Sequence, residues 1–134
     1  MLTLDEAVWL QAKIVEATGG TAGVKDPDKL QRILQRPNAM DGGVPKYPAL
    51  LQKAAILMQG MLYERPFVSG NRRTALAAVA IVLHASGYRL RVEASDYERF
   101  AKGVEMGITS WHRITAWLKG HVVRERSVAS GTSS

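Results

Sequence analysis

Apolar residues recur at helical spacing along most of the chain. Capping residues, glycines and prolines bound the stretches that have this period, so they predict helices. The predicted helices cover residues 4–18, 27–36, 49–64, 71–86, 95–106 and 111–122. No segment alternates strongly enough between apolar and polar residues to build a sheet core. The pattern therefore predicts an all-α fold, a compact bundle of about six helices.

One of these helices has no polar side. Residues 75–83 are apolar all round, so a helix there lacks a solvent face and is expected at the centre of the bundle. Further expectations concern the helix starts and the core. Thr3 with Glu6 and Ser95 with Glu98 match the capping-box spacing, and Asp26 and Ser110 are expected to cap the helices that follow them. Trp9 is expected to pack into the core.

Composition limits the class of protein. A chain of 134 residues suits one domain, predicted here as residues 1–126, and residues 127–134 lack apolar periodicity and are expected to be a disordered tail. There is no cysteine, no signal-peptide pattern and no apolar run long enough to span a membrane, so we expect a soluble cytoplasmic protein. The net charge of +6 permits nucleic acid, nucleotide or acidic protein partners. No recognition helix or long basic run supports nucleic acid.

The chemistry-bearing residues gather where the apolar helix begins. Gly70, Asn71, Arg72 and Arg73 precede it, and a helix N-terminus offers unpaired N–H groups and a positive dipole end. Arginine can hold a phosphate through two hydrogen bonds, so this stretch is a candidate phosphate site. An ordinary turn with a cap and solvated arginines fits the same residues, and the pattern alone leaves both readings open.

The stretch RPFVSGNRRTA resembles the Fic motif, HPFxxGN(G/K)R, and its death-on-curing (Doc) form, HPFxxxNKRTA. The similarity continues before and after it and covers roughly residues 2–123. The resemblance implies the Fic/Doc fold and a toxin with a cognate antitoxin. It also implies ATP with Mg²⁺ as cofactor and transfer of phosphate, or less expectedly AMP, to a protein hydroxyl. In this family one such target is a threonine of elongation factor Tu.

Two motif positions depart from the family. Arg65 stands where the family has its general-base His, and arginine stays protonated near neutral pH. Ser69 stands where the family has a metal-binding acid, so metal binding is expected to be weak and no ligand is certain. Arg72 falls where Doc proteins carry Lys, which favours phosphate over AMP transfer, and Arg73 aligns with the phosphate-binding arginine.

No other residue replaces the missing base. His84 lies thirteen residues beyond Asn71, about 20 Å along a helix, and nothing directs His112 or His121 toward the motif. Glu64 could be a surrogate base or metal ligand, or an ordinary solvent-facing residue. Catalysis is therefore expected to be impaired. The alternative is an inactive Fic-fold protein that binds a nucleotide, an anion or a partner protein.

The segment between Pro37 and Pro48 is rich in Pro and Gly and is expected to be an irregular loop, too broken for a good strand. The family resemblance makes it the flap that docks the target backbone by strand-like pairing. Its expected docking edge is Val44, Pro45, Lys46 and Tyr47.

Overall fold

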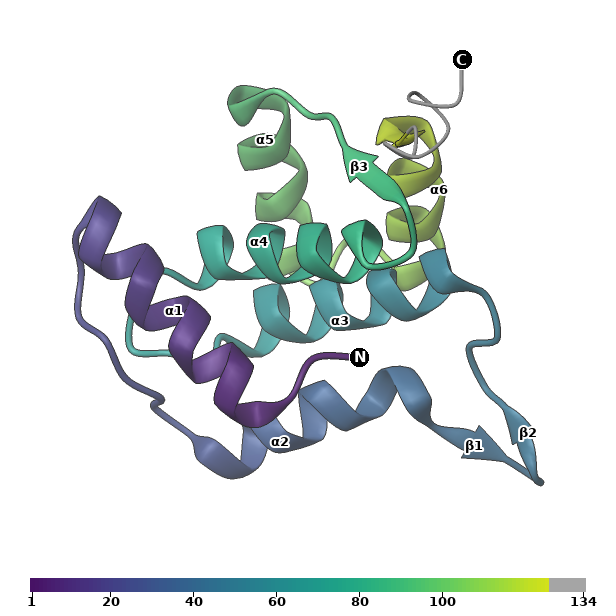
Figure 1. Cartoon of the computed structure of the whole chain (residues 1–134), viewed down its shortest axis with the longest axis horizontal. Helices are drawn as coiled ribbons and strands as arrows, with labels where there is room; N and C mark the ends of the chain where they lie inside the picture. Colours follow the sequence, from purple (N-terminus) through teal and green to yellow (C-terminus); the bar gives the residue numbers. More distant parts are fainter. Residues whose placement is uncertain (126–134) are drawn as a thin grey trace, which may run out of the picture.

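The computed structural model describes residues 1–125 as a bundle of six α-helices (Figure 1). They are α1 (Leu4–Thr18), α2 (Pro27–Gln35), α3 (Leu50–Glu64), α4 (Asn71–His84), α5 (Ala94–Glu105) and α6 (Trp111–His121). The prediction of an all-α bundle is confirmed. The predicted tail, 127–134, lies outside the described residues. Within the described part, no helix has the length and apolar character needed to cross a membrane.

Short strands join some of the helices. A 3₁₀ helix, η1 (Arg36–Asn38), leads into an antiparallel pair of β1 (Met40–Asp41) and β2 (Val44–Pro45). A second antiparallel pair joins β3 (Tyr88–Leu90) to β4 (Val122–Arg124), with Leu90 opposite Val122. Val122 therefore belongs to β4, and the prediction that the last helix includes it is wrong. Strands of two or three residues are too short to show a period, so the pairing of these strands could not be predicted from the sequence pattern.

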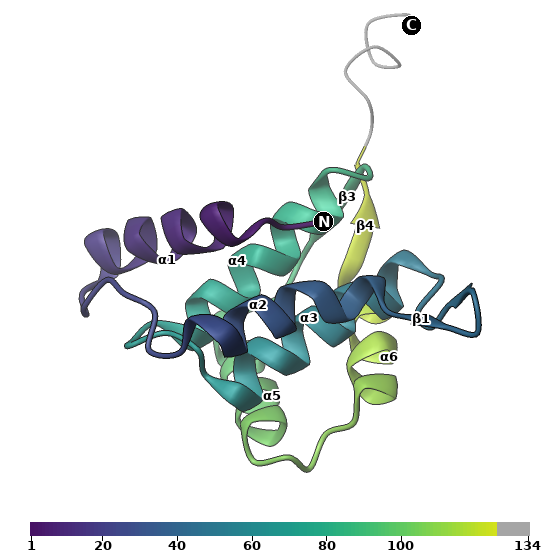
Figure 2. The same cartoon turned by 90° about the horizontal axis from the view of Figure 1, so that it is seen from below.

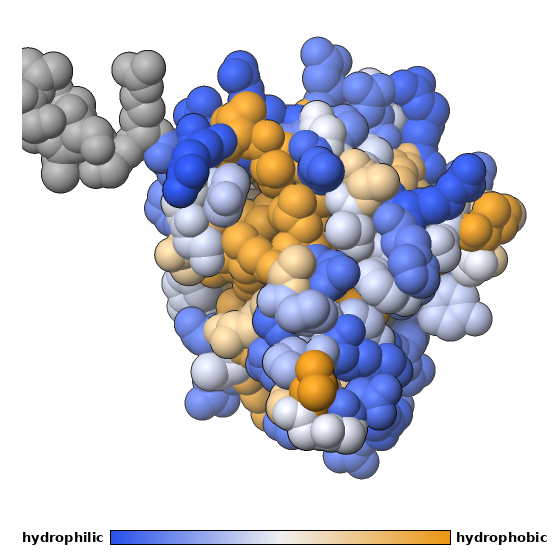
Figure 3. All heavy atoms as spheres, turned by 90° about the vertical axis from the view of Figure 1, so that its right-hand side faces the viewer, coloured by the Kyte–Doolittle hydropathy of each residue, from blue (hydrophilic) through white to orange (hydrophobic). Residues whose placement is uncertain are grey.

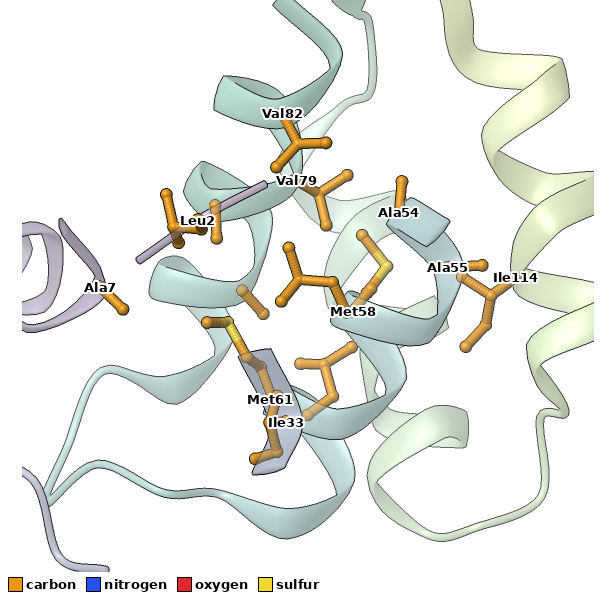
Figure 4. Packing of buried hydrophobic residues seen from close by; sticks show 14 of the residues in the cluster. Leu2, Ala7, Ile33, Ala54, Ala55, Met58, Met61, Val79, Val82 and Ile114 are labelled. Atoms are coloured by element: carbon orange, nitrogen blue, oxygen red, sulfur yellow. The ribbon is translucent and has the colours of Figure 1, made fainter. Parts of the chain in front are cut away.

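Helix α3 lies at the centre of the bundle. It packs against α2, α4, α5 and α6 and buries eight of its residues. Figure 4 shows Met58 and Met61 of α3 among apolar side chains from the surrounding helices, such as Val79 of α4 and Ile114 of α6. Burial of this apolar surface is the main stabilisation of the fold.

Helix α4 is buried against α1 and α3 but not on every side. Ile81 is 44% exposed, so the expectation of a helix without a solvent face is wrong at this position. Apolar surface is also visible elsewhere: Figure 3 shows an apolar band between hydrophilic edges on the face seen from the right of Figure 1. A folded protein has too little polar surface to cover itself, so exposed apolar residues are common.

Helix α1 turns a different face inward than its large residues suggested. Trp9 is 60% exposed, with the Lys13 ammonium 5.9 Å from its ring centre, so the expectation of a core position is wrong. The buried residues are Ala7, Leu10, Gln11 and Val15. The small Ala7 and the polar Gln11 carry little hydrophobic signal, although they share one side of the helix.

Two predicted caps have different outcomes. The hydroxyl of Ser110 accepts a hydrogen bond from the Arg113 N–H, as expected of the cap of α6. The capping box of Ser95 and Glu98 is wrong: the N-cap of α5 is Glu93, two residues before Ser95, and it makes no side-chain cap hydrogen bond. The carboxylate of Glu98 binds Arg72 instead. A contact distant in sequence has thus replaced a local one.

Thr74 is a buried residue of α4 whose hydroxyl has no hydrogen-bond partner within the described residues. An unpaired buried hydroxyl costs about 1–3 kcal/mol, so Thr74→Val should raise the free energy of unfolding by roughly 1 kcal/mol. Urea unfolding measures this change. The matched control is Thr115→Val, because the Thr115 hydroxyl donates to the Trp111 carbonyl, 2.8 Å away. Equal effects of the two substitutions would contradict the conclusion that the Thr74 hydroxyl is unpaired.

Candidate functional site

The loop between α3 and α4 is fixed to the connection between α1 and α2. Arg65 caps the C-terminus of α3, and its φ of 49° and ψ of 64° lie in the left-handed region. The carbonyl of Pro66 accepts from the Lys25 N–H at 2.8 Å, and the Val68 N–H donates to the Gly23 carbonyl at 3.0 Å. Phe67 is 1% exposed. The motif loop is therefore part of the packed structure.

Asn71 holds this loop in place from the first position of α4. Its Oδ1 accepts from the Phe67 N–H at 3.0 Å, and its Nδ2 donates to the Phe67 carbonyl at 3.1 Å. Gly70 caps the helix with a φ of 72°, and a Cβ there would lie 3.2 Å from Val15 Cγ1. The Asn71 side chain is thus engaged within the protein. It fixes the direction in which the first N–H groups of α4 point.

Ser69 is turned toward the protein. Its hydroxyl donates to the Thr21 carbonyl at 3.0 Å and accepts from the Thr21 N–H at 2.8 Å. The buried Gln11 donates from Nε2 to the carbonyls of Thr21 and Ser69, both at 3.0 Å, and accepts from the Gly23 N–H. The sequence interpretation missed Gln11. Its partners Thr21 and Ser69 lie 10 and 58 residues away in the sequence, so no local pattern indicated its role.

Arg72 is clamped by two carboxylates of α5. Its Nε and one terminal nitrogen donate to Glu105 at 2.6 Å, and the other terminal nitrogen donates to Glu98 at 2.5 Å. The Tyr97 hydroxyl donates to the Arg72 carbonyl at 2.6 Å. The side chain of Glu98 is 52% exposed and that of Glu105 is 11% exposed. No local sequence pattern indicates these contacts, because they join residues 26 and 33 positions apart.

These hydrogen bonds shift both partners toward their charged forms. They raise the pKa of Arg72 above its ordinary value and hold the pKa of Glu105 below its own. A carboxylate with a lowered pKa stabilises the fold above its unfolded value of about 4.3. That contribution is lost as the pH falls through the lowered pKa.

Removal of the clamp should therefore weaken the packing of α4 on α5. We expect Arg72→Ala to lower the free energy of unfolding by roughly 1–2 kcal/mol at pH 7, because two carboxylates lose their charged hydrogen bonds. The difference from wild type should shrink below about pH 4 as Glu105 becomes protonated. Unfolding curves over this pH range measure it. Arg99→Ala is the control, because it removes an arginine of α5 that pairs with Asp96 and takes no part in the clamp. A difference that grows in acid would contradict this account.

A cavity of about 400 Å³ lies at the start of α4. Its lining includes three arginines, Arg65, Arg72 and Arg73, and two glutamates, Glu98 and Glu105. Three guanidinium groups against two carboxylates leave one positive charge. Gly70 and Asn71 also line the cavity, together with the end of α1 at Thr18 and Gly19. The cavity thus joins the predicted residues Arg65, Gly70, Asn71, Arg72 and Arg73, and its size is that of a small-ligand site.

The remaining candidate bases lie elsewhere. Glu64 pairs with Arg36 at 2.9 Å, and His84 lies 3.0 Å from Glu125. His121 contacts the Trp117 carbonyl, and His112 stacks on Trp111. None of these four residues lines the cavity. Among residues 1–125, no group of three or more His, Asp or Glu side chains could hold a metal ion.

The predicted flap lies apart from the cavity. Its hairpin precedes the first residue of α3, whereas the motif follows the last one, and Figures 1 and 2 both show the hairpin away from the start of α4. The hairpin is more regular than the irregular loop that the sequence predicted. Val44 and Pro45 are exposed in β2, and the Lys46 N–H donates to the Ala39 carbonyl. Tyr47 is buried with its ring edge on Trp111. That the hairpin docks a target backbone stays a prediction.

The fold and the site together define an all-helical protein with an arginine-lined cavity at the N-terminus of an apolar helix. The sequence model of the Fic/DOC family matches residues 1–83, so the chain belongs to the Fic/DOC family. A curated relative, "Toxin Doc" of Mycolicibacterium smegmatis (strain ATCC 700084 / mc(2)155), is 40% identical over 82 residues. The match covers 61% of this chain and 61% of that relative. The residues that the family model matches contain the motif, whereas Glu98 and Glu105 lie beyond them.

Proposed function

We propose that this chain is a Doc-type toxin that binds the phosphates of ATP at the start of α4 and transfers phosphate slowly to a protein hydroxyl. The main support for the proposal is the cavity, which is lined by Arg65, by Arg73 and by the first turn of α4. No acceptor within residues 1–125 is recorded for the N–H groups of Asn71, Arg72 and Arg73. Such N–H groups and guanidinium groups bind phosphate oxygens.

Phosphate transfer suits a site of this kind because the protein's work is mainly to position the reactants and neutralise charge. The target hydroxyl would attack the terminal phosphate, ADP would leave, and the hydroxyl proton would pass to water. Arg65 cannot take that proton. Loss of a general base commonly costs about 10²–10⁴-fold in rate, so we expect slow turnover. Transfer of AMP, with release of pyrophosphate, is the less expected reaction.

Partners follow from the family. A toxin of this type has a cognate antitoxin, and the proposed protein target is elongation factor Tu, by family precedent. The basic chain, with a net charge of +6, suits an acidic protein partner. The proposal includes no nucleic acid or membrane partner, and it places the protein in the cytoplasm.

A second function is favoured by the orientation of Ser69. Its hydroxyl is hydrogen-bonded to Thr21 and is not free to bind a metal ion. Arg65, at the position of the family's base, cannot accept a proton. The residues that we propose to bind phosphate still line the cavity. The alternative is therefore an inactive Fic-fold protein that binds a nucleotide, another anion or a partner protein.

ATP labelled on either the alpha or the gamma phosphate separates these functions. With purified chain, Mg²⁺ and elongation factor Tu, transfer of the gamma label supports the first function, and transfer of the alpha label indicates AMP transfer instead. Binding of ATP without transfer of either label supports the second function. Absence of both binding and transfer would contradict the first function and the nucleotide-binding form of the second.

Arg73 should carry much of the affinity. A hydrogen bond to a charged group contributes about 1.5–3 kcal/mol, so Arg73→Ala should weaken ATP binding by about tenfold or more. Isothermal titration calorimetry measures the dissociation constant. Arg99→Ala again serves as control, because Arg99 does not line the cavity and is 76% exposed. Unchanged affinity of Arg73→Ala would remove this residue from the site.

A further inference from the structure

The oxygen atoms around the cavity do not fit a magnesium ion. Mg²⁺ in nucleotide sites is bound through carboxylates and phosphates in octahedral geometry. Here Ser69, at the position of the family's acid, has its hydroxyl engaged with Thr21. The two carboxylates that line the cavity, Glu98 and Glu105, both accept hydrogen bonds from Arg72. Each carboxylate that lines the cavity is therefore already paired with a guanidinium group, whose positive charge opposes a metal ion there.

Positive charge is present where the metal ligand is missing. Arg65 and Arg73 line the cavity, and no ion pair is recorded for either within the described residues. The hydrogen bonds from Arg72 are the main cause of the lowered pKa of Glu105, and the nearby charge of Arg65 makes a smaller contribution in the same direction. A guanidinium group can balance phosphate charge directly and presents a planar fork of donors. The cavity is therefore suited to an anion that brings no cation with it.

We infer that this site binds a triphosphate or diphosphate group as the metal-free anion. In this inference Arg65 supplies the positive charge that a bound metal supplies in related sites. The inference rests on the proposed function, because it concerns the same phosphate site. It extends to inorganic pyrophosphate, which presents the same phosphate oxygens without a nucleoside. The two departures from the family motif then belong together: Ser69 removes the metal ligand, and Arg65 replaces the charge.

Excess Mg²⁺ should oppose binding. The ion neutralises part of the phosphate charge and brings its own positive charge toward Arg65 and Arg73, the two guanidinium groups of the cavity for which no ion pair is recorded. Both arginines are exposed, and solvent screens such interactions, so we expect a change of only roughly threefold to tenfold in affinity.

Calorimetric titration of the full chain tests this directly. ATP and pyrophosphate are titrated in EDTA and in excess MgCl₂, at equal ionic strength. We expect both ligands to bind roughly threefold to tenfold more tightly in EDTA. Arg65→Gly should lose most of this difference. Glycine suits the left-handed backbone of residue 65, so the variant keeps the fold, which a thermal melt checks. Arg65→Lys should retain part of the difference, and Arg99→Ala all of it.

The possible outcomes distinguish failure of this inference from failure of the proposed function, ATP binding at the start of α4. Binding that requires Mg²⁺, is tighter with it or is equal in both buffers overturns the inference and leaves the phosphate site in place. Absence of binding in both buffers overturns the proposed function as well. Metal-free binding that Arg65→Gly leaves unchanged shows that Arg65 does not supply the charge and also overturns the inference.

Discussion

Replacing Arg65 by His together with Ser69 by Asp should raise the rate of gamma-phosphate transfer by about 10²-fold. The His supplies a side chain that can accept the hydroxyl proton, and general-base catalysis commonly contributes about 10²–10⁴-fold. The Asp supplies a carboxylate for Mg²⁺, which stabilises the charge that develops on the phosphate. We use the lower end of the range because Arg72 stays paired with Glu98 and Glu105 in this variant and is therefore not free to bind the phosphate. Transfer of the gamma label from ATP to elongation factor Tu measures the rate.

Each single variant serves as a control for the pair. Arg65→His alone should recover the base without the metal, and Ser69→Asp alone should recover metal binding without the base. The double variant should also bind ATP more tightly with Mg²⁺ than with EDTA, in contrast to the wild type. A double variant that folds, binds ATP and transfers no faster than wild type would show that these two positions do not limit the reaction.

Asn71→Ala should lower the free energy of unfolding by about 2–4 kcal/mol. The substitution removes both hydrogen bonds to the backbone of Phe67, and each unpaired buried polar group costs about 1–3 kcal/mol. The loop that contains Phe67 would also lose its fixed link to α4. Urea unfolding followed by circular dichroism measures the loss. We expect ATP affinity to fall with it, because the first N–H groups of α4 lose their fixed direction.

Asn38→Ala is the matched control. Asn38 is exposed in η1, and no side-chain hydrogen bond is recorded for it within the described residues. Surface substitutions of this kind usually change stability by no more than about 0.5 kcal/mol. If Asn71→Ala is as mild as Asn38→Ala, the hydrogen bonds to Phe67 do not stabilise the loop as described.

The helices could be predicted because their signals are local. The capping box of Thr3 and Glu6 and the cap at Asp26 depend on residues three positions apart, and both occur as expected. The position of Trp9 could not be predicted this way. Whether a side chain of α1 is buried depends on which side of the helix meets α4, and hydrophobicity alone pointed to the wrong side.

The candidate site shows the same division. Gly70 and Asn71 could be recognised from the motif, because the motif is contiguous. The partners of Arg72 could not, because α5 meets α4 only in the folded chain. The same holds for the Ser69 hydroxyl, whose partner Thr21 is 48 residues away. Motif resemblance thus located the site, whereas folding determined which of its side chains remain free for a ligand.

The most direct test of the phosphate site is an NMR titration of the ¹⁵N-labelled chain with ATP in EDTA. We predict that the largest shifts of backbone N–H signals fall on residues 70–73, with smaller shifts at Arg65 and at Thr18 and Gly19, which line the same cavity. Saturable shifts confined to another surface, or no shifts at millimolar ATP, would contradict a phosphate site at the start of α4.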